Sequence, residues 1–369
     1  MIKKTLIILS IFCFTSILKA QDGFINKFEN LQDKKIIAVG ESVHAINDFA
    51  NWNINFFKEL VLNDITKIFM LENDFSNSKQ INRYISGELE TIDIDNLMKK
   101  NLYGVWRSYA MREFLEWSRK YNAEKSKKDK IKFFGFDSQC GSCAMKEILK
   151  FINNNRPDLK TKLSNEGLKL LSEINLSKNY NLKKLTKEEQ DLMEQTLEKM
   201  NQLFEKEIDL DKTIHTDLLA LNHAWEFENA NPLNFTNIRD RNMAIIFKEI
   251  IKNETKPVLM WAHNGHINKS KTLFYKPIGY HLYENFGPNY LAIGLDFKEK
   301  EGSNKFSPID KSNWIANKIN YEANKNIFVL ETKNIGRLAI RNYGTSSGRM
   351  KLKNNNQFDY IVYFKEIKN

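Results

Sequence analysis

The chain has 369 residues, a formal net charge of +10 and 42% hydrophobic residues. This length suits one large domain with an insertion, or two domains. Lysine and arginine are scattered along the chain, and no recognisable nucleic-acid-binding module accompanies them. The basic charge is therefore typical of a solvated surface, and we expect no nucleic-acid partner.

The first twenty residues have the pattern of a cleavable signal peptide. Lys3 and Lys4 precede an apolar run at residues 5–18, and the small residue Ala20 follows it. The run is too short to span a bilayer comfortably, and no later run approaches that length, so we expect no membrane anchor after cleavage. The predicted location is the periplasm or the extracellular space.

Short apolar runs rich in β-branched and aromatic residues recur along the chain. They lack polar alternation, which is typical of strands that are covered on both faces. The runs are residues 35–39, 68–71, 131–134, 258–261, 291–294, 327–330 and 360–363. Helical spacing of apolar residues at 49–62 and 111–122 separates the first three. This order predicts an α/β fold with a mostly parallel central sheet flanked by helices.

The pattern of residues changes in the middle of the chain, where strand-like runs disappear and the sequence becomes charged, with helical spacing of its apolar residues. Thr186 and Glu189 have the spacing of a capping box before an apolar-periodic stretch. We therefore expect a helical insertion at residues 145–235 in an α/β core made of residues 21–144 and 236–369. The insertion could form part of the cleft wall, or a lid over the cleft.

Two cysteines remain once residues 1–20 are removed. Cys140 and Cys143 lie in a Cys-Gly-Ser-Cys run that follows a strand-like stretch. An oxidising compartment makes a local disulfide plausible. A thioredoxin-like redox motif would require the pair to open a helix beside a strand, so a structural disulfide, redox activity and free thiols all stay open.

Acidic and imidazole side chains follow four of the expected strands. Because ligands bind outside the carboxyl ends of the strands in open α/β sheets, these side chains are expected to converge. Taken singly, each carboxylate could also cap a helix or bind turn amides. In chain order, the residues are Glu41 and His44, then Glu72 and Asp74, then Asp137, and finally His263, Asn264 and His266.

Several stretches resemble, in order, the sequence blocks of the erythromycin esterase family. The resemblance covers most of the chain after the leader, apart from the helical segment. The matching stretches are residues 40–44, 71–75 with 81–84, 117–122 with 134–137, 239–244, 261–267 and 279–290. Two positions depart from the family pattern, because Ala45 and Asp48 stand where members usually have glycine and glutamate. These departures bear on the identity of the substrate more than on the reaction.

The resemblance implies hydrolysis of a carboxylic ester, which for the family is the macrolactone of macrolides such as erythromycin, by activated water without a covalent intermediate. His44 would accept the proton from water, while Glu72 or Glu41 would hold its tautomer. His263 and His266 would stabilise the oxyanion or protonate the leaving group. The expected substrate contacts are Asn264, Asp74, Asp137 and Arg107.

Three alternatives remain. The five acidic and imidazole groups could hold a divalent metal in a metal-dependent hydrolase of another envelope ester, although no cofactor is our first expectation. Residues 344–348 fit a Gly-x-Ser-x-Gly pattern, but no histidine follows His281, so a serine hydrolase is disfavoured. A non-catalytic envelope binding protein is the third alternative.

Overall fold

The computed structural model describes residues 23–89, 93–173, 185–206, 212–231, 233–301, 315, 319, 325–334, 338–342, 348–352 and 356–368. The predicted signal peptide at residues 1–20 lies outside this part of the chain. The same holds for residues 344–347 of the Gly-x-Ser-x-Gly stretch.

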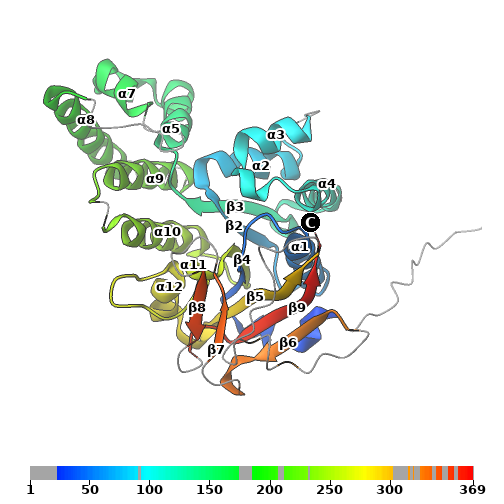
Figure 1. Ribbon diagram of the computed structural model, residues 1–369. Helices are drawn as coiled ribbons and strands as arrows, with labels where there is room; N and C mark the ends of the chain where they lie inside the picture. The colour runs from blue at the N-terminus through cyan, green and yellow to red at the C-terminus, as the bar shows by residue number, and fades with distance from the viewer. Residues whose placement is uncertain are drawn as a thin grey trace, which may run out of the picture.

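A seven-stranded sheet forms the centre of the described structure (Figure 1). Its strand order is β3-β2-β4-β1-β5-β9-β6, and every neighbouring pair is parallel except β6 and β9. The strands are β1 (Ile36–Glu41), β2 (Ile68–Asp74), β3 (Lys132–Asp137), β4 (Val258–His263), β5 (Tyr290–Lys300), β6 (Ile327–Glu331) and β9 (Tyr360–Ile367). A separate antiparallel pair is formed by β7 (Leu338–Arg341) and β8 (Arg349–Leu352). The predicted α/β class with a mostly parallel sheet is confirmed.

Helices cover both faces of the sheet (Figure 1). They are α1 (Asn47–Leu62), α2 (Phe75–Ser86), α3 (Ile94–Asn101), α4 (Tyr109–Ala123), α5 (Gly141–Asn155), α6 (Pro157–Lys160), α7 (Asn165–Leu171), α8 (Lys187–Glu205), α9 (Lys212–Glu228), α10 (Phe235–Ile251), α11 (Asn264–Ile267) and α12 (Ile278–Phe286). Short 3-10 helices lie at Phe24–Lys27, Leu31–Asp33, Gly104–Trp106, Lys127–Asp129, Gly287–Asn289 and Thr332–Asn334.

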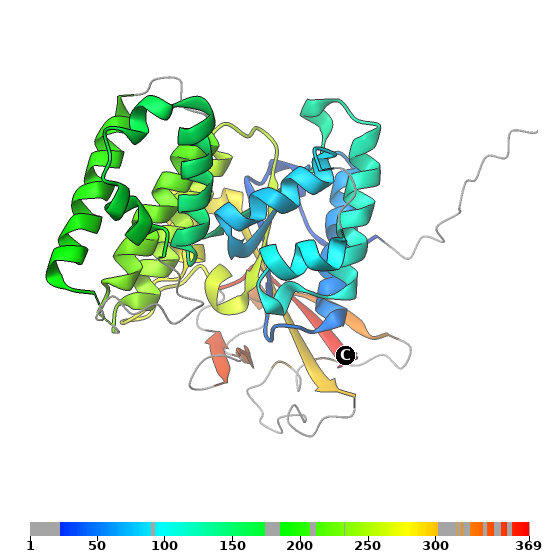
Figure 2. The same cartoon turned by 90° about the horizontal axis from the view of Figure 1, so that it is seen from above.

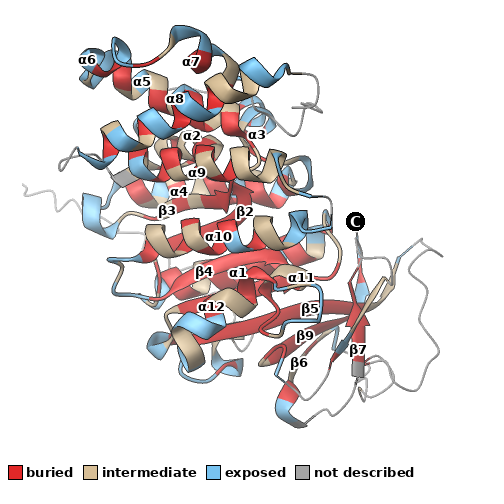
Figure 3. Ribbon diagram, turned by 90° about the vertical axis from the view of Figure 1, so that its left-hand side faces the viewer, coloured by how far each residue is buried: buried red, intermediate tan, exposed pale blue. Residues whose placement is uncertain are grey.

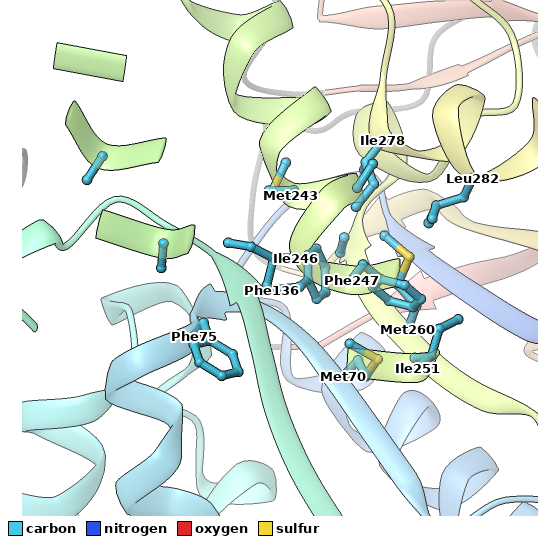
Figure 4. Packing of buried hydrophobic residues seen from close by; sticks show 14 of the residues in the cluster. Met70, Phe75, Phe136, Met243, Ile246, Phe247, Ile251, Met260, Ile278 and Leu282 are labelled. Carbon is cyan, nitrogen blue, oxygen red and sulfur yellow. The ribbon is translucent and has the colours of Figure 1, made fainter. Parts of the chain in front are cut away.

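Alternate residues of each central strand enter two different hydrophobic cores, since successive strand side chains point to opposite faces. On β1, Ile37 and Val39 join the core with α1 and α4, whereas Ile36 and Ala38 join the core with α10 and α12. Figure 3 shows the strands buried throughout the middle of the molecule, and Figure 4 shows Met243 and Phe247 of α10 packed near the strands. Burial on both faces explains why the strand sequences carry continuous apolar runs.

The helical segment expected at residues 145–235 extends to one side of the sheet (Figure 2). The predicted capping box is present at the start of α8, where Thr186 and Glu189 bond each other's backbone N–H groups. Asp217 of α9 connects this segment to α2 by accepting hydrogen bonds from Ser76 at 2.8 Å and Lys79 at 2.5 Å. The boundaries of the insertion and its role as a wall or lid stay predictions.

Cys140 and Cys143 form a disulfide at the start of α5, directly after β3. The pair thus spans the first turn of the helix, with Cys140 as the N-cap residue. Within the described ranges, no helix is both long enough and apolar enough to cross a membrane.

Candidate active site

The carboxyl ends of β1, β2 and β4 bring three histidines and two glutamates into one cluster. β4 lies between β1 and β2 in the sheet, so His263 at its end is next to both Glu41 and Glu72. The rings of His44 and His263 have centroids 5.0 Å apart. The expected convergence of these side chains is therefore present in the structure.

His44 is held by a buried carboxylate. Its Nδ1 lies 2.6 Å from Oε1 of Glu41, whose other oxygen accepts a bond of 3.2 Å from Trp261 Nε1. Burial alone would lower the pKa of His44, but its bond to Glu41 and the charges of Glu41 and Glu72 outweigh burial, so the pKa is raised above 6.5. The side chain is 32% exposed and lines a pocket, so Nε2 is the ring nitrogen left to face a ligand.

Glu72 is the central anion of the site. One carboxylate oxygen accepts the backbone N–H of His263 at 3.0 Å, and the other lies 2.8 Å from the Arg239 guanidinium and 3.3 Å from His266 Nε2. Burial would raise the pKa of Glu72, but the cationic His266 and Arg239 hold it well below its ordinary value. Glu72 is therefore ionised, and it is paired with two cations.

His266 is bound by carboxylates through both ring nitrogens. Nδ1 lies 2.7 Å from Asp240 Oδ1, and the Tyr275 hydroxyl lies 3.3 Å from the same nitrogen. Burial would lower the pKa of His266, yet the charges of Asp240 and Glu72 raise it to about 10. At neutral pH His266 is thus an imidazolium that donates a hydrogen bond to each carboxylate.

His263 has the opposite protonation state. Burial, and the positive charges that His44 and His266 carry when protonated, lower the pKa of His263 to about 3, so the ring is neutral. Nδ1 accepts the Gly265 backbone N–H at 3.2 Å, and Nε2 lies 3.3 Å from the carbonyl oxygen of Ser42. Because that oxygen can only accept, the proton of neutral His263 belongs on Nε2.

A pocket of about 1240 Å³ opens over this cluster. Its inner end is lined by His44, Glu72, Arg239, His263 and His266. Its outer walls are residues 268 and 270–273, Tyr275 and Lys276, together with Arg349–Lys351 around β8 and residues 356 and 357. The described part of the helical segment 145–235 supplies none of these lining residues.

Asn264 and Asp74 are placed where they support the backbone, away from the expected contact with substrate. Asn264 is fully buried, donates to the carbonyl of Leu295 at 2.9 Å and accepts its N–H at 3.3 Å. Asp74 caps α2 by accepting the N–H of Asn77 at 3.0 Å, and it accepts the N–H of Cys140 at 3.0 Å. Neither side chain lines the pocket.

Asp137 and Arg107 also lie outside the pocket lining. Asp137 is fully buried and accepts bonds from Arg239, of which the shortest is 2.8 Å, and from the Tyr103 hydroxyl at 3.3 Å. It therefore orients the guanidinium that reaches Glu72. Exposed Arg107 donates twice to the Leu102 carbonyl oxygen. The substrate contacts expected of both residues stay predictions.

Three residues that neighbour the cluster were not predicted from the sequence. Arg239, Asp240 and Tyr275 are not among the site residues that the sequence predicted, yet all three contact His266. The run Arg239–Asp240 belongs to one of the stretches that resemble the family, which was the available signal. Tyr275 lies on a loop where no periodicity points to a site.

The position after His44 is under backbone strain. Ala45 has φ of 61°, in the left-handed region that glycine adopts without a steric penalty. This geometry accounts for the glycine that the family pattern carries there. Gly40, before Glu41, meets a different restriction, since a Cβ atom there would collide with the Asn264 side chain.

Most of the imidazole nitrogens in the cluster already contact other groups of the protein. Nδ1 of His44 and both nitrogens of His266 contact carboxylates. In the described ranges, no group of three or more histidine, cysteine, aspartate and glutamate residues is arranged to hold a metal ion.

Comparisons with known proteins agree with this architecture. A protein of Bacillus subtilis (strain 168) named "Putative hydrolase YbfO" is 23% identical over 273 residues, which are 67% of this chain and 59% of that protein. The match thus spans less than two thirds of that relative. The structure of a Bacillus cereus protein superposes with a TM-score of 0.74 at 18% identity, covering 92% of this chain and 90% of the other.

Two more solved structures share the fold. One, titled as a succinoglycan biosynthesis protein, has a TM-score of 0.75 at 18% identity and covers 92% and 89% of the two chains. The other is a mutant of the erythromycin esterase EreC in its open conformation, with a TM-score of 0.65, 17% identity and coverage of 91% and 92%. The erythromycin esterase family model matches residues 66–367, a range that begins after Glu41 and His44. The chain therefore belongs to the erythromycin esterase family.

Proposed function

We propose that this protein is a hydrolase that cleaves a carboxylic ester by attack of water that His44 activates, without a covalent intermediate. The observation that carries the proposal is the bond of 2.6 Å between Glu41 and His44 Nδ1, which leaves Nε2 facing the pocket. A carboxylate in this position fixes the tautomer and stabilises the imidazolium that forms after proton transfer.

The proposed reaction uses the charges of the site in two steps. Nε2 of His44 removes a proton from water as the water oxygen adds to the ester carbonyl. His266 and Arg239, both cationic, line the pocket beside His44, and we assign to them the stabilisation of the oxyanion that forms. The carbon–oxygen bond to the alcohol then breaks, and protonated His44 returns the proton to the leaving alkoxide. The products are a carboxylic acid and an alcohol.

His263 has a positioning role in this scheme. Its neutral ring packs 5.0 Å from the His44 ring, and both of its nitrogens are bonded to backbone groups. A neutral ring avoids a third positive charge beside His44, which would oppose protonation of the base. We therefore assign oxyanion stabilisation to His266 and Arg239 in place of His263.

A macrolactone is the first substrate to test, because the family takes its name from an enzyme of that kind. The pocket of about 1240 Å³ exceeds the roughly 300–1,000 Å³ that drug-sized ligands usually occupy. Another ester of the cell envelope is the second candidate, in keeping with the signal-peptide pattern at residues 1–20, and we propose a periplasmic or secreted location.

The test is hydrolysis of a macrolide panel and of 4-nitrophenyl hexanoate by purified protein lacking residues 1–20. Mass spectrometry detects a ring-opened macrolide, and absorbance detects 4-nitrophenolate. We expect product with one or both, loss of product in His44→Ala, and retention in His215→Ala, an exposed histidine on α9. Turnover that survives in His44→Ala, or no cleavage of any ester, would refute the proposal.

A chelator-treated sample addresses the metal-dependent alternative. Because three of the imidazole nitrogens already contact carboxylates, we expect treatment with EDTA to leave the initial rate within about twofold. A rate that falls on chelation and returns with zinc or manganese would establish metal-dependent hydrolysis instead.

A further inference from the structure

The outer walls of the active-site pocket carry an excess of positive charge. Lys271 and Lys276 lie on one wall, and Arg349 and Lys351 lie on the other, where β8 is found in Figure 1. Among the described residues that line the pocket, Glu72 is the one carboxylate, and it lies at the inner end, where it is paired with Arg239 and His266. The described walls therefore face the pocket with cations alone.

The three lysines of this group are available to a ligand. Lys271, Lys276 and Lys351 are exposed, and within the described chain none of them forms an ion pair. Lys271 contacts the ring of Tyr280 at 5.3 Å, which leaves its charge uncompensated. Lys269 provides a contrast, because it is buried and bonds Asp359 at 2.6 Å and is absent from the lining.

Apolar side chains accompany the cations. Leu273 is 88% exposed, and Tyr275 and Met350 line the same pocket. A ligand could therefore place an apolar chain along these residues, direct its ester toward His44, and leave a charged group near the lysines. A negative charge there would be attracted, whereas a cation would be repelled.

We propose that the substrate is an anionic ester, one that carries a carboxylate, sulfate or phosphate group beside an apolar portion. This inference rests on the proposed ester hydrolysis and narrows its substrate class. It disfavours macrolides that carry a protonated amine, and it favours the second candidate, another envelope ester. Lys271, Lys276 and Lys351 are the residues that determine this charge selectivity.

Coulomb's law gives the expected size of the preference for an anionic ester over a neutral one. A unit charge at about 8 Å in water changes binding by roughly twofold, so three lysines together give on the order of tenfold at low salt. Exposed charges are screened beyond about 10 Å at 0.1 M salt, so the effect must weaken as salt is added.

The experiment compares three chromogenic esters with six-carbon acyl chains: neutral 4-nitrophenyl hexanoate, the monoanion of mono-4-nitrophenyl adipate, and cationic 4-nitrophenyl 6-(trimethylammonio)hexanoate. We expect kcat/KM in the order anionic, neutral, cationic, with the anionic ester favoured over the neutral one by about tenfold at low ionic strength, chiefly through KM. In the triple variant Lys271→Gln, Lys276→Gln, Lys351→Gln the ratio should approach one.

The matched control replaces three exposed lysines outside the pocket, Lys160, Lys199 and Lys206, with glutamine. It removes the same total charge and should keep the preference. Equal rates for the three esters, or a preference that survives in the pocket variant, would overturn the inference.

A binding measurement separates this inference from the proposed function. Calorimetry compares the uncleavable amides 6-(4-nitroanilino)-6-oxohexanoate and N-(4-nitrophenyl)hexanamide. If no ester is cleaved but the anionic amide binds more tightly in a manner that needs the three pocket lysines, ester hydrolysis fails and anion selectivity stands. If the two amides bind alike, or neither binds, the selectivity fails whatever the esters show.

Discussion

The two ends of the site use the same residue type in contrasting ways. At the end of β1, His44 contacts one carboxylate through one nitrogen and is 32% exposed. Within α11, His266 contacts carboxylates through both nitrogens, is 16% exposed and has a pKa raised to about 10. The second ring is a fixed cation, whereas the first keeps a nitrogen free to exchange a proton. In the reaction that we propose, the number of carboxylates around each ring thus separates the base, His44, from the group that stabilises charge, His266.

The largest expected effect is on catalysis, when His44, the histidine that can exchange a proton, is replaced. His44→Ala should lower kcat by about 10²–10⁴-fold, because general-base catalysis contributes a factor of that order. Since the side chain is partly exposed, thermal unfolding should stay close to that of the parent protein. The measurement is steady-state hydrolysis beside a thermal melt. A folded variant that keeps more than about a tenth of the rate would assign the base to another group.

His266, which stays protonated, should matter more for the stability of the fold than His44. His266→Ala leaves Glu72 and Asp240 buried without their shared cation, so the free energy of unfolding should fall by about 3–5 kcal/mol. His44→Ala should cost clearly less, and His215→Ala, at an exposed position of α9, should cost almost nothing. Urea unfolding of the three variants gives the ranking. Equal losses for His44→Ala and His266→Ala would remove the distinction between the two ends.

The pH dependence of activity sharpens the comparison further. Protonated His44 cannot accept a proton, and its pKa is raised above 6.5, so kcat/KM should rise with pH through a midpoint above that value. His266, which bonds carboxylates through both ring nitrogens, keeps its charge until the pH approaches about 10. Glu41→Gln removes the anion that raises the pKa of His44, so the midpoint should move to lower pH. A midpoint unchanged in Glu41→Gln would show that another group titrates.

The smallest expected effect concerns the turn that carries His44. Ala45 has φ of 61°, a conformation that costs an L-residue about 1–2 kcal/mol relative to glycine. Ala45→Gly should raise the free energy of unfolding by up to about 1 kcal/mol, because the greater chain entropy of glycine offsets part of the relief. Urea unfolding measures this change. A loss of stability would mean that the Ala45 methyl group makes a contact worth more than the strain.

Much of the fold could be read from apolar runs. All seven runs became strands of the main sheet, but the strands reach further than the runs; β1 continues through Glu41 and β4 through His263. Those polar ends are paired and buried because their partners come from distant segments, which no local pattern shows. The antiparallel placement of β6 beside β9 likewise depends on pairing across the chain.

The site was predictable in its clustering but less so in its side-chain directions. His263 and His266 are three residues apart and meet on one side of the short helix α11, whereas Asn264 between them turns toward β5. Sequence spacing places all three at one strand end, but tertiary packing decides which of them faces the pocket. Asp240 was missed because its partner His266 belongs to a different element.

Gly40 has a consequence for how such an enzyme can diversify. It keeps the β1 end against Asn264, and thereby keeps the turn that holds Glu41 and His44 beside the turn that holds His263 and His266. A side chain at this position would separate the two turns and so change the reaction centre. Lys271 and Lys351, on the outer walls of the pocket, are exposed, and in the described part of the chain no such close contact restricts their side chains. If our proposals hold, substitution of Lys271 or Lys351 would change which substrate is favoured, whereas the absence of a side chain at Gly40 keeps the arrangement of Glu41 and His44 unchanged.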